Sequence, residues 1–139
     1  MPHLALANLA RIGKLKAEPP DARERAGLLR SATVRLQDAR QVTLSLESRF
    51  DLAYNAAHSA ALSALRINGY RSDNRYLVFQ CLEHTLGFTP AQWLLLNQAH
   101  TKRNLAEYEG DLDVTVSFID EPIEHVAALI AATQALETP

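Results

Sequence analysis

The stretch from Asp51 to Leu65 places small side chains on nearly every face of a helix. Its small residues are Ala53, Ala56, Ala57, Ser59, Ala60, Ala61, Ser63 and Ala64. Small side chains let neighbouring helices approach closely, so this stretch is typical of the central helix of a bundle. The alternation of apolar and polar residues that marks a half-buried strand occurs convincingly nowhere, and residues 114–118 come nearest to it. The sequence therefore predicts an all-α protein.

Prolines, glycines and capping residues divide the chain into helices. The run Glu18-Pro19-Pro20 ends a short helix expected over residues 2–16, because proline biases its predecessor away from helical backbone angles. We therefore expect a short N-terminal helix and linker over residues 1–20 and a helical bundle over residues 21–139. The first two helices of the bundle are expected from an N-cap at Asp21 to about residue 43 and over residues 46–68. Two more are expected from a cap at Asp73 to residue 86 and from a cap at Thr89 to about residue 108. The last helix follows a connector over residues 111–120 and has Pro122 in its first turn. Gly69, Gly87 and Gly110 each follow a helical stretch, where glycine fits a left-handed C-terminal cap.

Composition excludes several classes of protein. Apolar residues make up 47% and charged residues 22% of the 139 positions, which excludes a disordered chain. No apolar run approaches the roughly 20 residues that span a bilayer, so we expect a cytoplasmic protein without a membrane partner. The only cysteine, Cys81, can form neither an internal disulfide nor a cysteine-based zinc site.

Charge is distributed unevenly along the chain. The net charge of -2 hides a C-terminal stretch, residues 106–139, that contains eight acidic residues and no lysine or arginine. Such asymmetry indicates pairing between a basic and an acidic face, within one subunit or across two. The alternative is a solvated acidic helix.

The densest polar cluster falls on the helix expected to end near residue 108. At helical spacing, one side of that helix carries His100, Arg103, Asn104, Glu107 and Tyr108. A cation, an imidazole, a carboxylate and a phenol placed together could bind a phosphate and move a proton. The simpler alternative is a hydrogen-bonded seam between helices or subunits, in which Arg103 pairs with Glu107.

Other polar and aromatic residues are expected to be structural. His58 and His84 belong to separate helices and make no recognisable metal site, and we expect neither a metal nor a cofactor. The aromatic residues Tyr76, Phe79, Phe88 and Trp93 are expected in the core or in the packing between helices.

A basic group surrounds the turn at Gly69 and Tyr70. Arg66, Arg71 and Arg75 could receive a nucleic-acid backbone or a partner's acidic surface, because guanidinium groups suit phosphates and carboxylates alike. A solvated turn is the simpler expectation.

Two segments carry a family likeness. The segment YNAAHSAALSAL from Tyr54 to Leu65, followed by Asn68-Gly69-Tyr70-Arg71, resembles the alanine-rich helix and Gly-Tyr-Arg exit of HEPN domains. Residues 103–108, RNLAEY, look like the family's motif helix, in which an arginine, usually followed by a polar residue, precedes a histidine by four to six residues. The likeness covers about residues 21–136 in helix order. It implies an antiparallel bundle of four to five helices that usually dimerises, with both motif helices around a shared cleft.

The resemblance also implies a link to RNA. Many HEPN domains are metal-independent ribonucleases of toxin or defence systems, and others accompany small nucleotidyltransferases. In the ribonucleases the arginine steadies the phosphate, while the histidine serves proton transfer or charge stabilisation during attack by the 2′-OH. Here Tyr108 stands where the closest spacing would place the histidine. A phenol, with a pKa of about 10, is a poor proton acceptor at neutral pH.

This departure favours a dimeric binding or regulatory module over an efficient ribonuclease. Arg103, Asn104, Glu107 and Tyr108 would line the dimer cleft, with His100 at its edge. One alternative is an active metal-independent ribonuclease of a toxin or defence system that uses Arg103 with His100 or Tyr108. Another is a partner subunit of a separately encoded nucleotidyltransferase. The expected partners are thus a second copy of the chain, RNA, and a nucleotidyltransferase or an antitoxin.

Overall fold

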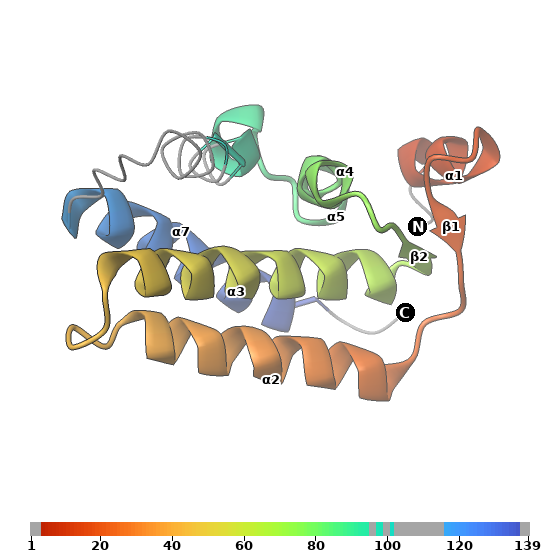
Figure 1. The fold of residues 1–139 in the computed structure, drawn as a ribbon. Coiled ribbons are helices and arrows are strands. Elements are labelled where there is room, and N and C mark those ends of the chain that lie inside the picture. Colours follow the sequence, from red (N-terminus) through yellow and green to blue (C-terminus); the bar gives the residue numbers. More distant parts are fainter. Residues whose placement is uncertain (1–3, 95–96, 99–100, 102–115, 137–139) are drawn as a thin grey trace.

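The computed structural model describes residues 4–94, 97–98, 101 and 116–136 (Figure 1). Its elements are α1 (Leu4–Arg11), β1 (Lys16–Ala17), α2 (Ala22–Ala39), α3 (Leu46–Ile67), β2 (Tyr70–Arg71), α4 (Arg75–Gln80), α5 (Leu82–Thr85) and α7 (Val116–Gln134). Residues 90–94 are also helical. Apart from one ladder of two-residue strands, the regular structure of these residues is helical, and the all-α prediction is confirmed.

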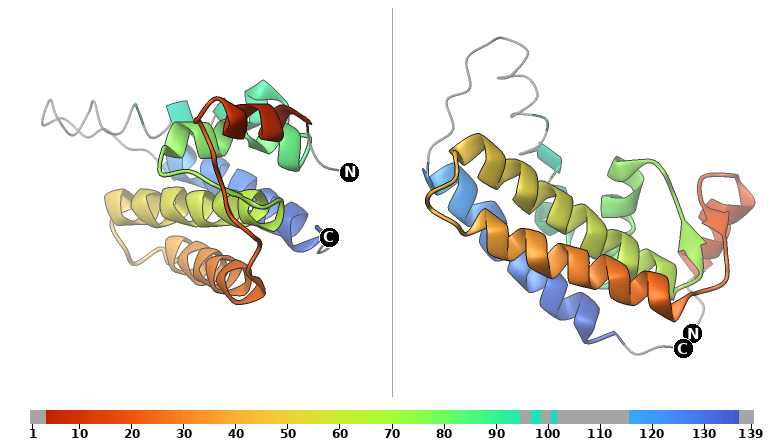
Figure 2. Two further views of the ribbon diagram at one scale, coloured as in Figure 1. Left: turned by 90° about the vertical axis from the view of Figure 1, so that its right-hand side faces the viewer. Right: turned by 60° about the horizontal axis from the view of Figure 1, so that its bottom comes forward.

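Helix α3 occupies the centre of the fold. Helices α2 and α3 run side by side in opposite directions, α7 packs against both, and α4 and α5 contact α3 (Figures 1 and 2). The alanines of α3 are buried: Ala53, Ala56, Ala57, Ala60, Ala61 and Ala64 are each at most 1% exposed. Their lack of bulk lets several helices pack closely around one. The expectation of a central small-residue helix is therefore met.

Capping side chains fix the starts of the long helices. The Asp21 carboxylate accepts from the backbone N–H of Arg23 at 2.9 Å and of Glu24 at 3.4 Å, as expected for α2. Ser45 caps α3 in the same way. The expected end of α2 near residue 43 is wrong, because the helix stops at Ala39 and Val42 lies 81% exposed, beyond the apolar stripe.

The single helix expected over residues 73–86 is interrupted. Asn74, and not Asp73, caps α4, and the helix is interrupted at Cys81 before α5 begins. Tyr76 is 46% exposed and meets Trp93 edge-on, whereas Phe79 and Trp93 lie in the core. Tyr76 is therefore a helix-packing residue at the edge of the core and not a fully buried one.

The last helix begins earlier than expected. Because α7 starts at Val116, Pro122 lies inside the helix and not in its first turn. Residues 116–118 of the strand-like stretch are helical, and residues 114–115 lie outside the described residues. The proline removes one helical hydrogen bond, and its side chain is buried.

The N-terminal segment is attached to the far end of α3. Antiparallel pairing aligns Lys16 with Arg71 and Ala17 with Tyr70. Leu6 and Leu15 join the same hydrophobic core as the long helices. A two-residue ladder has no alternation for sequence analysis to detect.

The acidic C-terminal part of the chain pairs with basic residues of the same subunit at two positions. Arg49 of α3 lies 3.8 Å from Asp120, and Arg40, just after α2, lies 3.9 Å from Glu124. Arg49 is buried, and its Nε also donates to the Ala39 carbonyl at 2.7 Å. These contacts fit the expectation of an acidic face paired with a basic one within a subunit.

Candidate functional site

The residues expected to line the dimer cleft lie outside the described residues. They are His100, Arg103, Asn104, Glu107 and Tyr108. The described residues contain two other groups of arginines, and these groups differ in their partners.

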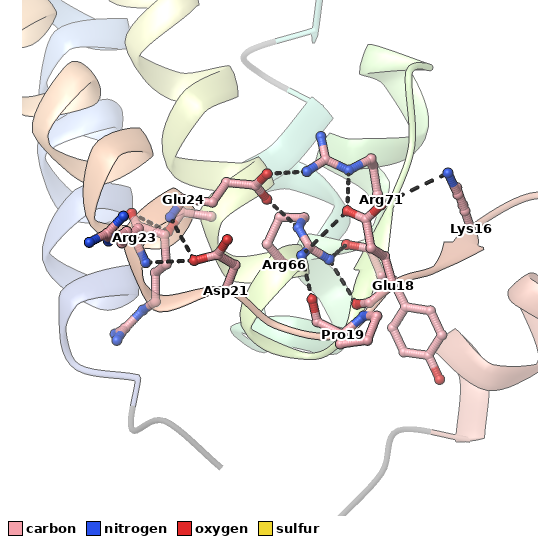
Figure 3. Close-up of polar contacts among 11 residues, drawn as sticks. Lys16, Glu18, Pro19, Asp21, Arg23, Glu24, Arg66 and Arg71 are labelled. Atoms are coloured by element: carbon pink, nitrogen blue, oxygen red, sulfur yellow. Dashed lines mark hydrogen bonds and ion pairs between the residues drawn. The ribbon is translucent and has the colours of Figure 1, made fainter.

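The first group surrounds the turn between α3 and β2 (Figure 3). Arg66 is only 2% exposed, and its Nε bonds the Glu24 carboxylate. Its two terminal nitrogens donate to the carbonyls of Glu18, at 2.9 Å, and Pro19, at 2.7 Å. One of them also lies 3.5 Å from the Glu18 carboxylate. Every part of the buried guanidinium is thus occupied by groups of this chain.

Arg71 closes the same network from β2. Its Nε donates to Glu18 at 2.9 Å, and its Nη2 bonds Glu24. Hydrogen bonding by Arg66 lowers the pKa of Glu24, and Arg71 adds to that effect against the opposing cost of desolvation. Lys16 also lies 3.8 Å from Glu18, so three cations share two carboxylates within this network. Because both carboxylates and both guanidinium groups are bonded to groups of this chain, the network joins the segment before α2 to the end of α3 and to β2.

The turn was therefore misinterpreted from the sequence for two of its three arginines. Arg66 is buried, and Arg71, whose side chain is 30% exposed, is already paired, because the chain before α2 folds back and brings Glu18 against them (Figure 3). The third arginine of that group, Arg75, faces elsewhere.

The second group, which we term the His58 face, consists of Asn55, His58 and Ser59 of α3, Arg35 of α2 and Arg75 of α4. Arg35 Nη1 donates to Ser59 Oγ at 3.1 Å, and Arg75 Nη1 donates to Asn55 Oδ1 at 3.1 Å. Arg75 also lies over the Tyr54 ring, 5.5 Å from its centre. Among the described residues, no carboxylate forms an ion pair with either guanidinium.

His58 lies between these two cations. Its ring meets Phe79 edge-on at 6.2 Å, and its buried Nε2 has no hydrogen-bond partner among the described residues. Burial, together with the charges of Arg75 and Arg35, lowers the pKa of His58 to about 4. The imidazole is therefore neutral at pH 7, while the surrounding face keeps two positive charges.

This arrangement suits an anionic ligand. Asn55 and Ser59 are one turn apart on α3, so the guanidiniums bonded to them lie along one face of that helix. Guanidinium groups bind phosphate through paired N–H groups. Sequence analysis assigned His58 a structural role and did not single out Arg35, because their meeting depends on how three helices pack.

The described part of the chain contains neither a cluster of metal ligands nor a membrane-spanning helix. There, no three histidine, cysteine, aspartate or glutamate side chains gather as metal ligands would. In the same residues, no helix combines the length and the apolar character needed to cross a membrane. Comparisons with protein-family models, with curated proteins and with solved structures find no match for this chain.

Proposed function

We propose that the chain is a dimeric, HEPN-like module that binds RNA without cleaving it efficiently. The observation that carries this proposal is the His58 face, where Arg35 and Arg75 bond neutral side chains of α3 and have no carboxylate partner within the described residues. The sequence likeness over residues 54–71 and 103–108 adds the expectation of a second cationic position at Arg103.

Electrostatics favours a phosphate backbone as the ligand of this face. Two like charges without a carboxylate partner repel each other, and a bound phosphate relieves that repulsion. The amide of Asn55 and the hydroxyl of Ser59 are already bonded to the arginines, which fixes the position of each guanidinium before a ligand arrives. Such preorganisation reduces the entropy lost on binding.

Protonation argues against efficient cleavage at the same face. Cleavage through the 2′-OH needs one group to accept a proton and another to donate one. With a pKa of about 4, His58 carries a proton in only about one molecule in a thousand at pH 7. It is therefore a poor proton donor, and Tyr108 at the motif position is a poor acceptor.

The test measures RNA binding and RNA integrity in the same samples. Fluorescence anisotropy with a labelled single-stranded RNA should show binding by the wild type that weakens as salt increases. Arg75→Gln and Arg35→Gln together should weaken binding by about tenfold or more, with little change in melting temperature. The matched control is Arg11→Gln, at an exposed arginine of α1, a helix that contributes no residue to the His58 face, and this variant should bind like the wild type.

Two outcomes would contradict the proposal. One is wild-type protein that binds no RNA at low salt. The other is robust metal-independent cleavage that both Arg103→Ala and His100→Ala abolish in folded protein, which would establish the ribonuclease alternative.

A further inference from the structure

A second surface, which shares Arg35 with the His58 face, runs along the outer side of α2. It is a groove of about 630 Å³ lined by Gly27, Arg30, Ser31, Val34, Arg35 and Asp38 of α2 and by Leu52 of α3. Helix α2 forms the lower edge of the molecule in Figure 1, and no described element lies beyond it. The groove is therefore open to a partner.

Two residues in this groove are not explained by packing among the described residues. Val34 is 49% exposed at the centre of α2, although its apolar side chain gains nothing from water. Gly27 lies inside the helix, and a Cβ added there would meet nothing within 4 Å. Glycine in a helix interior costs about 1 kcal/mol relative to alanine. An approaching helix from outside the chain would account for both residues.

The charges of the groove are arranged symmetrically about Val34. Arg30 lies four residues before it and Asp38 four residues after it, so all three fall on one side of the helix. Both charged residues are exposed, and within the described ranges neither forms an ion pair. The remaining cation of the groove, Arg35, is already bonded to Ser59.

Such a pattern is complementary to itself. If two copies of α2 pack antiparallel about a two-fold axis at Val34, Arg30 and Asp38 each lie about 6 Å along the helix from that axis, in opposite directions. Arg30 of each copy then stands level with Asp38 of the other, and the two valines meet at the axis. A two-fold interface requires this reciprocity between positions.

We propose that a second copy of the chain binds this face, with α2 antiparallel to α2, Val34 on the axis and two reciprocal pairs between Arg30 and Asp38. The contact is separate from the cleft expected at Arg103, and it requires neither RNA binding nor the HEPN resemblance. If both contacts form and their two-fold axes intersect at right angles, the particle is a tetramer. Loss of the α2 contact then halves the mass of the particle, as it does where the α2 contact alone makes a dimer.

Charge exchange tests this register directly. In sedimentation velocity at low salt, Arg30→Asp should weaken association by about tenfold or more, because two aspartates then face each other at each pair. Asp38→Arg should do the same by opposing two arginines. The double variant, Arg30→Asp with Asp38→Arg, should restore the wild-type mass, since the pairs are exchanged. Arg11→Asp, a charge reversal outside the groove, is the matched control and should keep the wild-type mass.

Cysteine cross-linking gives an independent readout. A residue on a two-fold axis faces its own copy, so Val34→Cys should form an intermolecular disulfide under mild oxidation. The natural Cys81 is only 1% exposed and should not interfere. Leu4→Cys, at an exposed position on α1, should cross-link far less.

Three results would overturn the proposed α2 contact. A wild-type particle whose mass equals one chain at high concentration would overturn the proposal. So would single charge reversals that leave the mass unchanged, or a double variant that fails to restore association although it melts like the wild type. Loss of RNA binding with an intact mass profile would instead contradict only the proposed function.

Discussion

Arg66 and Glu24 form an ion pair that joins the last turn of α3 to the first turn of α2. The Arg66 side chain is only 2% exposed, whereas the Glu24 side chain is 31% exposed. A charge taken so far out of water is tolerated only when its hydrogen-bonding capacity is met. The carbonyls of Glu18 and Pro19 meet the rest of that demand.

Removal of Arg66 should therefore be far more costly than removal of Arg71. We expect Arg66→Met to lower the free energy of unfolding by about 2 to 3 kcal/mol, because the carbonyls of Glu18 and Pro19 and the Glu24 carboxylate lose the donor that they share. Arg71→Met, at a side chain that is 30% exposed, should cost about 1 kcal/mol. Urea denaturation measures both values, and equal losses would contradict the dominant role of Arg66.

His58 should make the protein less stable as the pH falls from about 6.5 to 4. Its pKa is lowered from 6.5 to about 4 in the folded state, so the unfolded state binds more protons across this window. The neutral imidazole contributes its full stabilisation above about pH 6.5, and this contribution is lost as the pH falls to 4. Because His58 is partly exposed, we expect the free energy of unfolding to fall by only about 2 kcal/mol over this range. His58→Leu should flatten the profile, whereas the control His84→Leu should keep it. A profile unchanged by His58→Leu would disprove this assignment.

Glu24 should affect the stability of the protein at lower pH than His58 does. Because its pKa is lowered from 4.5 by Arg66 and Arg71, its contribution is present above pH 4.5 and is lost as the pH falls further. Glu24→Gln should therefore reduce stability at pH 7 and weaken the loss of stability below pH 4.5. Thermal melts at closely spaced pH values separate this effect from that of His58. If Glu24→Gln leaves the loss of stability below pH 4.5 unaltered, the role assigned to Glu24 is contradicted.

Cys81 should be inert in the folded protein. Burial raises the pKa of its thiol to about 11, and the thiolate is the form that reacts with disulfide reagents. We expect negligible labelling at pH 8 under native conditions and complete labelling in denaturant. Rapid native labelling would contradict the buried position of this side chain.

Two glycines should respond to alanine in opposite directions. Gly69 has φ +89°, in the region that alanine rarely adopts, so Gly69→Ala should destabilise the protein by about 1 kcal/mol or more. Gly27→Ala should stabilise the isolated chain by about 1 kcal/mol, since an added Cβ would meet nothing within 4 Å. Denaturation of dilute protein tests both, and a loss of stability in Gly27→Ala would indicate packing that the single chain does not contain.

The predictable features are those that depend on local sequence. The alanines of α3, the Asp21 cap and the Thr89 start depend on neighbours within a few residues. Thr89 indeed closes a reciprocal cap with Gln92, in which Thr89 N–H donates to Gln92 Oε1 at 2.8 Å. Local rules misplaced the end of α2, the break at Cys81 and the position of Pro122, where tertiary packing decides.

The unpredicted features join residues that are distant in the chain. The arginines at Arg66 and Arg71 looked like a basic patch because their carboxylate partners, Glu18 and Glu24, lie more than 40 residues earlier. The His58 face likewise depends on α2 and α4 meeting α3. The residues singled out on the Arg103 helix remain predictions.

The contact between the N-terminal segment and the end of α3 also determines when this segment can dock during biosynthesis. Arg66 Nη1 binds a carbonyl 48 residues earlier, at Glu18. Ribosomes add about 5 to 20 residues per second, so residues 1–20 must wait about 2 to 10 s before their docking site has been made. During that interval Leu6 and Leu15, which are buried in the core of the folded chain, have no native surface to cover them.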